Sequence, residues 1–154
     1  MLIIVCGLPG SGKTSLSRAL AKRFAAEHIS SDLTRKRLVA NPTYSQEEKK
    51  RVYDEMARET QDLLMQGKSV IADATFQDND QRTRFSEIAA SARTGSFIIL
   101  CTLPEERIRR RLERRMHSAS DADFDVYLKV KKEFKPLSGG YLTIDNSAPL
   151  KECV

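Results

Sequence analysis

The chain has 154 residues, of which 40% are hydrophobic and 31% are charged, and its formal net charge is +5. The length suits one domain with one core, and no apolar run approaches the roughly 20 residues of a membrane-spanning helix. The charge favours anionic partners, although it does not separate a nucleotide from a nucleic acid. We therefore expect a soluble, cytoplasmic domain that covers residues 1–154 and has no membrane partner.

The first element is an apolar, β-branched run over residues 2–6, which predicts a buried strand and is too short for a signal peptide. It leads into residues 7–14, Gly-Leu-Pro-Gly-Ser-Gly-Lys-Thr. Apolar residues spaced four apart up to Phe24 then predict a helix. The octapeptide matches the P-loop pattern G-x-x-x-x-G-K-[ST] in the strand–helix context that this motif requires.

The P-loop predicts the residues that would hold the phosphates of a nucleotide. Its glycines allow a tight turn that brings backbone N–H groups to phosphate oxygens, and the helix N-terminus adds partial positive charge. Lys13 would place a charge on the β- and γ-phosphates, and the Thr14 hydroxyl would hold Mg²⁺. The predicted nucleotide-binding residues here are Gly7, Leu8, Pro9, Gly10, Ser11, Gly12, Lys13, Thr14 and Ser15.

After a possible short strand over residues 28–30 come Asp32 and Arg35, which share a face if a helix begins there. That face would lie beside the P-loop, at the carboxyl edge of the sheet, where open α/β folds bind ligands. Asp32 could accept a proton from a hydroxyl that attacks the γ-phosphate, and Arg35 could hold a substrate or a phosphate oxygen. The alternative is that Asp32 caps the helix and Arg35 is solvated.

Residues 33–66 carry two helical patterns. Ser45 and Glu48 form a capping box for the second helix, and Gly67 stands at its expected end. A predicted strand over residues 69–72 is then followed by Asp73. An acidic residue at the end of a buried strand commonly reaches Mg²⁺ or orients a substrate, and the alternative is a simple turn residue.

The next predicted helix begins at Asp78 or Asn79, turns Phe85, Ile88 and Ala92 inward and ends by Gly95. It precedes a strand over residues 96–102. Three aromatic residues, Tyr44, Tyr53 and Phe76, either pack in the core or stack on a base.

Pro104 stands at a first-turn position of a helix with Ile108, Leu112 and Met116 toward the core. Residues 107–115 contain six arginines in nine positions. They are either a solvated face or, for Arg111 and Arg115, groups that reach the phosphates. We predict that residues 107–121 are a lid region.

A second capping box, Ser120 with Asp123, precedes a helix that begins at Phe124, and Gly139-Gly140 forms a turn before a strand over residues 141–144. Short apolar strands that alternate with helices predict a three-layer α/β fold with about five parallel strands. The cysteines show no C-x-x-C or zinc spacing. We expect buried thiols at Cys6 and Cys101 and a free thiol at Cys153.

Four motifs in this order resemble the small P-loop kinases related to the 5′-kinase domain of phage polynucleotide kinase, a group with zeta toxins and gluconate kinase-like enzymes. They are the P-loop, Ser-Ser-Asp-x-x-Arg, Val-Ile-x-Asp-x-Thr, and Arg-Leu-x-x-Arg followed by Ser-Asp-Ala-Asp. The likeness covers nearly the whole chain. Thr75 stands where the phage enzyme has Asn, and residues 76–84 do not align cleanly with that enzyme; these departures weigh against a polynucleotide acceptor.

The resemblance implies a role for each matching residue. Asp32 would be the base and Arg35 would hold the acceptor, which binds to an insertion at residues 33–66. Asp73 would lie near the metal, Arg111 and Arg115 would form the lid pair, and Asn146 would pack on adenine.

The sequence thus predicts a kinase that uses ATP and Mg²⁺, with Lys13, Asp32, Arg35 and Arg115 as catalytic residues. A small-molecule hydroxyl is the first choice of acceptor, and a polynucleotide 5′-hydroxyl is the second. The alternative of another class is a nucleotide-binding regulatory module that hydrolyses ATP slowly.

Overall fold

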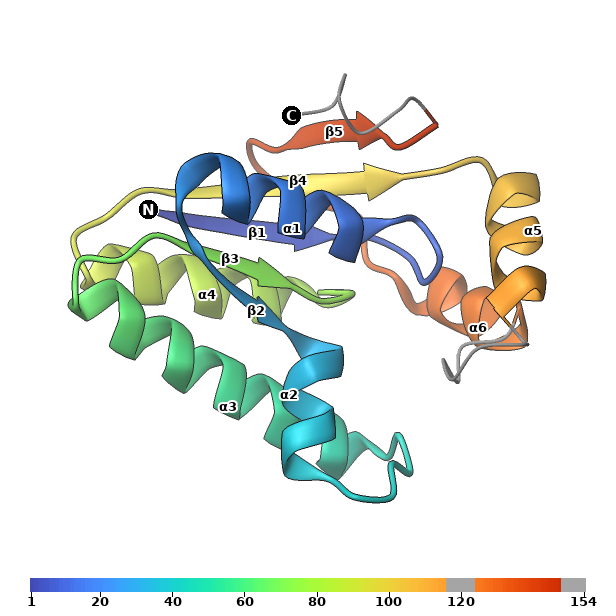
Figure 1. Ribbon diagram of the computed structural model, residues 1–154, viewed down its shortest axis with the longest axis horizontal. Coiled ribbons are helices and arrows are strands. Elements are labelled where there is room, and N and C mark those ends of the chain that lie inside the picture. The colour runs from blue at the N-terminus through green and yellow to red at the C-terminus, as the bar shows by residue number, and fades with distance from the viewer. Residues whose placement is uncertain (116–123, 148–154) are drawn as a thin grey trace.

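The computed structural model describes residues 1–115 and 124–147, except for the side chain of Arg115. It contains a five-stranded sheet in which every strand pair is parallel (Figure 1). The strands, in spatial order, are β2 (Glu27–Ser30), β3 (Val70–Asp73), β1 (Leu2–Cys6), β4 (Ser96–Thr102) and β5 (Leu142–Asp145). The predicted α/β fold with five parallel strands is confirmed.

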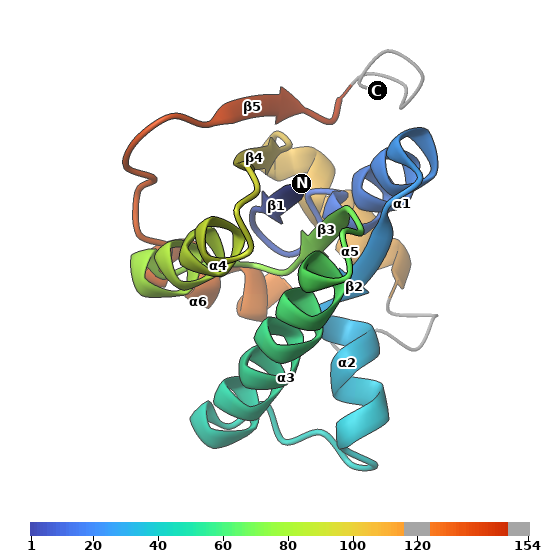
Figure 2. The same ribbon diagram turned by 90° about the vertical axis from the view of Figure 1, so that its left-hand side faces the viewer.

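Helices cover both faces of the sheet, which gives the predicted three layers (Figure 2). Helix α1 packs on one face with Leu16 and Leu20, and helices α3 and α4 pack on the other. The remaining helices lie at or near the carboxyl edge, where all the strands end (Figure 1). The helices are α1 (Lys13–Phe24), α2 (Ser31–Leu38), α3 (Gln46–Met65), α4 (Asn79–Ser91), α5 (Glu105–Arg115) and α6 (Phe124–Glu133). None of the helices in the described residues is long and apolar enough to cross a membrane.

Several element boundaries differ from those predicted by a residue or two. Strands β3 and β5 each begin and end one residue later than expected, and β2 begins at Glu27. Helix α1 begins at Lys13, because the P-loop residues Lys13 and Thr14 already form its first turn. Pro104 precedes α5 instead of lying in its first turn, and its carbonyl accepts the N–H of Ile108 at 3.0 Å.

Of the residues of α4 predicted to face the core, Phe85 is buried, whereas Ile88 and Ala92 are partly buried and pack against the core. Tyr53 and Phe76 lie in this core with ring centroids 5.4 Å apart, and the Tyr53 hydroxyl accepts the N–H of Phe76 at 3.0 Å. Both are therefore core aromatics, whereas Tyr44 is 53% exposed. Cys6 and Cys101 are buried free thiols as predicted, and Met116, Ser120, Asp123 and Cys153 lie outside the described residues.

The strand register aligns the residues that precede the candidate site. Asp73 pairs with Val5 on one side and with Ser30 on the other, so the three residues form one row across β1, β3 and β2. Neighbouring strands lie about 4.8 Å apart, and the backbones of Val5 and Ser30 are therefore roughly 10 Å apart. The P-loop follows β1 and helix α2 follows β2, so both begin from the same edge.

Candidate active site

The P-loop lies between β1 and α1, and its backbone needs glycine at two positions in particular. Gly7 has φ 144° and Gly12 has φ 94°, both in the region that disfavours residues with a side chain. A Cβ atom at Gly7 would meet the carbonyl oxygen of Cys101, and one at Gly12 would meet the side-chain amide of Asn146. The P-loop therefore packs closely against β4 and the segment after β5.

Polar groups of the P-loop are held from inside the protein. The carbonyl of Ser11 accepts Asn146 Nδ2 at 3.0 Å and Cys101 Sγ at 3.3 Å. Burial raises the pKa of the Cys101 thiol, so this group stays a neutral donor. Lys13 Nζ donates to the carbonyl of Leu8 at 3.0 Å, so its side chain lies across the P-loop. The phosphates of a nucleotide would bind within the same loop.

Asn146 is 5% exposed, and its amide supports the loop directly. The sequence predicted an adenine contact for this residue; that role stays a prediction, but the amide group already has a structural partner. Ser11 Oγ is buried and has no hydrogen-bond partner among the described residues. A buried hydroxyl without a partner inside a glycine-rich cradle fits a site built to receive further polar atoms.

Helix α5 places Arg111 over the P-loop. Its guanidinium donates to the carbonyls of Gly10 and Asn146, each at 3.5 Å. Ile108 and Leu112 are buried as predicted and pack in a small cluster that includes Leu8 of the loop. These apolar contacts fix the helix so that Arg111 faces the loop. Residues 116–121 of the predicted lid region and the side chain of Arg115 lie outside the described residues.

Asp73 ends β3 with its side chain buried, at 3% exposure, and His28 Nε2 lies 3.4 Å from its Oδ2. The two residues are 45 positions apart in the chain, so no local pattern linked them. His28 pairs with Ile71 in the parallel register, and Asp73 lies two positions after Ile71, so His28 and Asp73 share one face of the sheet. Asp73 therefore lies at the carboxyl edge with a histidine beside it.

Thr14 and Asp73 are the residues that the sequence predicts to hold Mg²⁺, and this role stays a prediction. The described residues contain no group of three or more His, Cys, Asp or Glu that could bind a metal alone. Such a sparse donor set fits Mg²⁺ in a phosphate site, because this ion keeps several waters and takes other ligands from the phosphates. When bound there, Mg²⁺ would neutralise charge on the phosphates.

Asp32 lies in the first turn of α2, where Ser30 occupies the N-cap position. Its side chain is 77% exposed, and its Oδ1 lies 3.5 Å from Arg35 Nη1, one turn along the helix. The predicted alternative, in which Asp32 caps the helix and Arg35 is solvated, does not describe this geometry, because Arg35 is only 12% exposed.

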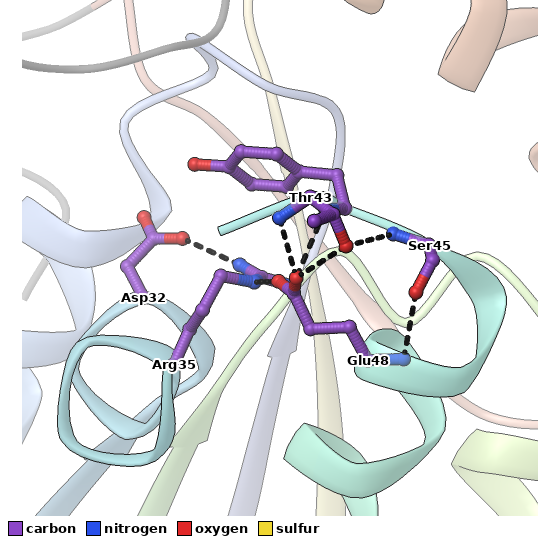
Figure 3. Close-up of polar contacts among 6 residues, drawn as sticks. Asp32, Arg35, Thr43, Ser45 and Glu48 are labelled. Carbon is purple, nitrogen blue, oxygen red and sulfur yellow. Dashed lines mark hydrogen bonds and ion pairs between the residues drawn. The ribbon is translucent and has the colours of Figure 1, made fainter. Parts of the chain in front are cut away.

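Glu48 is the partner of Arg35 that sequence reasoning missed. Arg35 Nε donates to Glu48 Oε1 at 2.8 Å, across 13 positions of the chain (Figure 3). Glu48 Oε2 accepts three further bonds: the Thr43 N–H at 2.6 Å, the Thr43 hydroxyl at 3.0 Å and the Tyr44 N–H at 3.1 Å. The capping-box pattern predicted the bond of the Glu48 backbone, whose N–H donates to Ser45 Oγ at 3.2 Å. It did not predict the contacts of the Glu48 carboxylate.

The side chain of Glu48 is 6% exposed. Desolvation by burial raises the pKa of its carboxyl, but the hydrogen bonds from Thr43, Tyr44 and Arg35 outweigh that effect and hold the pKa below its ordinary value. Glu48 is thus a charged carboxylate that joins α2, α3 and the segment between them.

Comparisons with known proteins identify the family of the chain and several of its relatives. A model of the AAA domain family matches residues 2–137, so the chain belongs to that family. It is 28% identical over 165 residues to the uncharacterized protein Rv2004c of Mycobacterium tuberculosis, and the alignment covers 99% of this chain and 33% of that protein. The uncharacterized protein Mb2027c of Mycobacterium bovis matches equally. The chain thus spans about a third of the length of these curated relatives.

Solved structures share the fold. Kti12 of Chaetomium thermophilum, in complex with ADP-AlF3, has a TM-score of 0.79 at 20% identity over 96% of this chain and 90% of that one. APS kinase CysC of M. tuberculosis, in complex with AMPPNP and APS, has a TM-score of 0.74 at 16% identity, over 99% of this chain and 91% of that one. A gluconokinase of Sinorhizobium meliloti has a TM-score of 0.71 at 18% identity, over 97% of this chain and 85% of that one. The fold is that of P-loop kinase-like proteins.

Proposed function

We propose that this chain is an ATP-dependent kinase that transfers the γ-phosphoryl group to a hydroxyl of a small-molecule acceptor. The observation that carries the proposal is the row formed by Val5, Asp73 and Ser30. The P-loop begins two residues after Val5, and Asp32 lies two residues after Ser30, so both leave one edge of the sheet from strand positions about 10 Å apart. We infer that the transferred phosphoryl group and the acceptor hydroxyl lie between the nucleotide cradle and this carboxylate.

In this mechanism, the chain positions charges around the transferred group. Lys13 leaves the carbonyl of Leu8 for phosphate oxygens, and the P-loop N–H groups bind the same phosphates. Arg111, held over Gly10, stabilises charge in the transition state. Residues of this kind lower the barrier without forming a covalent intermediate.

The carboxylate of Asp32 is the proposed base. The acceptor oxygen forms a bond to the γ-phosphorus while the bond from that phosphorus to the β–γ bridging oxygen breaks. ADP leaves with the electron pair of the broken bond, and the hydroxyl proton passes to Asp32. Its exposure and its place on the first turn of α2 leave it accessible to an acceptor. Arg35, held by Glu48, keeps Asp32 oriented.

The test is an acceptor screen that measures ADP release with and without each of four classes of compound: nucleosides, sugars, antibiotics and 5′-hydroxyl oligonucleotides. We expect ADP release that depends on a small-molecule acceptor. Release stimulated by oligonucleotides alone would favour a polynucleotide acceptor. Slow hydrolysis that no compound stimulates would favour the regulatory module and would contradict the kinase.

A further inference from the structure

Tyr44 is the exposed aromatic side chain beside the proposed acceptor site, and its backbone conformation is unusual. It has φ 56°, in the left-handed region that bulky residues seldom adopt. Such a conformation costs free energy and persists only where the surrounding structure enforces it. The residue is nevertheless 53% exposed, so its burial does not account for the strain.

The enforcing contacts come from Glu48. Its Oε2 accepts the N–H groups of both Thr43 and Tyr44, and it accepts the Thr43 hydroxyl as well. Its other oxygen holds Arg35 (Figure 3). The guanidinium of Arg35 in turn lies over the Tyr44 ring, 4.8 Å from the centroid. One buried carboxylate therefore fixes the backbone of Tyr44 and also the group that packs on its ring.

The position of this pair relative to Asp32 suggests what it does. Arg35 follows Asp32 by one turn of α2, and three residues of helix rise about 4.5 Å. An acceptor that rests on the ring of Tyr44 would therefore lie within a small molecule's length of the proposed base. A ring-bearing molecule of ordinary size can make both contacts.

Resting on the kinase proposal above, we propose that Tyr44, held by Glu48 and Arg35, is the acceptor platform, and that the acceptor is a hydroxylated ring compound. Two sources share this chemistry, a nucleoside, whose base stacks on the phenol ring, and a sugar, whose ring packs on it. The rival role is structural: the Tyr44 ring only shields Arg35.

The chain contains no Trp, so Tyr44→Trp gives a single fluorescent reporter at the platform. The experiment titrates this variant, loaded with a non-hydrolysable ATP analogue and Mg²⁺, with adenosine, methyl β-D-glucoside and the acyclic polyol sorbitol. Tyr141→Trp, at a residue 43% exposed beside β5, is the matched control. We expect saturable quenching by at least one ring probe in Tyr44→Trp only, and none by sorbitol. The responding probe identifies the source as a nucleoside or a sugar.

Removal of the ring then separates a ligand contact from a structural role. Tyr44→Ala should raise the acceptor KM at least about 10-fold, with the KM for ATP and the melting temperature unchanged, and Tyr44→Phe should stay within about threefold of the parent. No quenching by either ring probe, equal quenching by sorbitol, or a Tyr44→Ala variant that only melts earlier would each overturn the platform. Because quenching needs no phosphoryl transfer, its failure is distinguishable from failure of the kinase proposal.

Discussion

The Nε of Arg35 donates to Oε1 of Glu48 at 2.8 Å, and this bond joins helix α2 to helix α3. The Arg35 side chain is 12% exposed and that of Glu48 6%, so the pair is largely shielded from solvent. Removal of Glu48 leaves the largely buried Arg35 with Asp32, 3.5 Å away, as its remaining ionic partner among the described residues, and this loss is more damaging than that of a surface pair. The pair is therefore a structural joint between the two helices that the acceptor proposal involves.

Glu48→Gln should lower the midpoint of thermal unfolding at pH 7, with the α2–α3 joint as the cause. The folded-state pKa of Glu48 is depressed, so the carboxylate stabilises the fold above its unfolded pKa of about 4.3. That contribution is lost as the pH falls through the folded value. The melting difference between parent and Glu48→Gln should therefore shrink in acid, whereas Glu87→Gln, an exposed change on α4, should show little difference at any pH. A pH-independent difference would exclude the charge as its cause.

The fold was predictable because its signals are local. Strand runs, caps and the P-loop occupy short segments, and parallel strands between helices leave few topologies. The contacts of the Glu48 carboxylate were not predictable. A capping box already gives this residue a local role, and nothing in the sequence links it to Arg35, 13 positions away. His28 and Asp73 meet only through strand register. Asn146 was predicted near the nucleotide, but its bond to Ser11 depends on the packing of the segment after β5.

Lys13→Ala should weaken ATP·Mg²⁺ binding about 10- to 100-fold, the effect of losing charge-assisted hydrogen bonds to phosphate. The bond from Lys13 to the Leu8 carbonyl lies within the loop, so the fold should survive its loss. Isothermal titration calorimetry measures the affinity. Lys22→Ala, at the exposed far end of α1, is the control and should bind as the parent does. Equal affinity in both variants would place the nucleotide elsewhere.

Arg111→Ala should lower kcat about 10²-fold or more with a smaller change in KM, because the lost interaction forms in the transition state. Arg114 is exposed on the same helix, and Arg114→Ala should stay close to the parent. Arg115 follows Arg111 by one turn, and we expect Arg115→Ala to resemble Arg111→Ala. Steady-state kinetics decides. Equal effects of the Arg111 and Arg114 replacements would reduce this helix to a solvated basic face.

Asn146→Ala separates the two roles of this residue. If its amide only supports the P-loop through Ser11, ATP and GTP affinities should fall by the same factor, about 5- to 10-fold for one lost buried hydrogen bond. If it also packs on adenine, the loss should be larger for ATP. Competition binding of the two nucleotides measures the ratio. An unchanged affinity for both would remove Asn146 from the site.

The central claim is phosphoryl transfer with Asp32 as the base, and the most direct measurement follows label from [γ-³²P]ATP into the acceptor that the ADP-release screen identifies. Asp32→Asn keeps the size of the side chain and removes the proton acceptor. We predict that the parent labels the acceptor, that Asp32→Asn folds and binds ATP normally, and that its transfer rate falls about 10²-fold or more. Label found only in inorganic phosphate, or an Asp32→Asn variant as fast as the parent, would contradict the account.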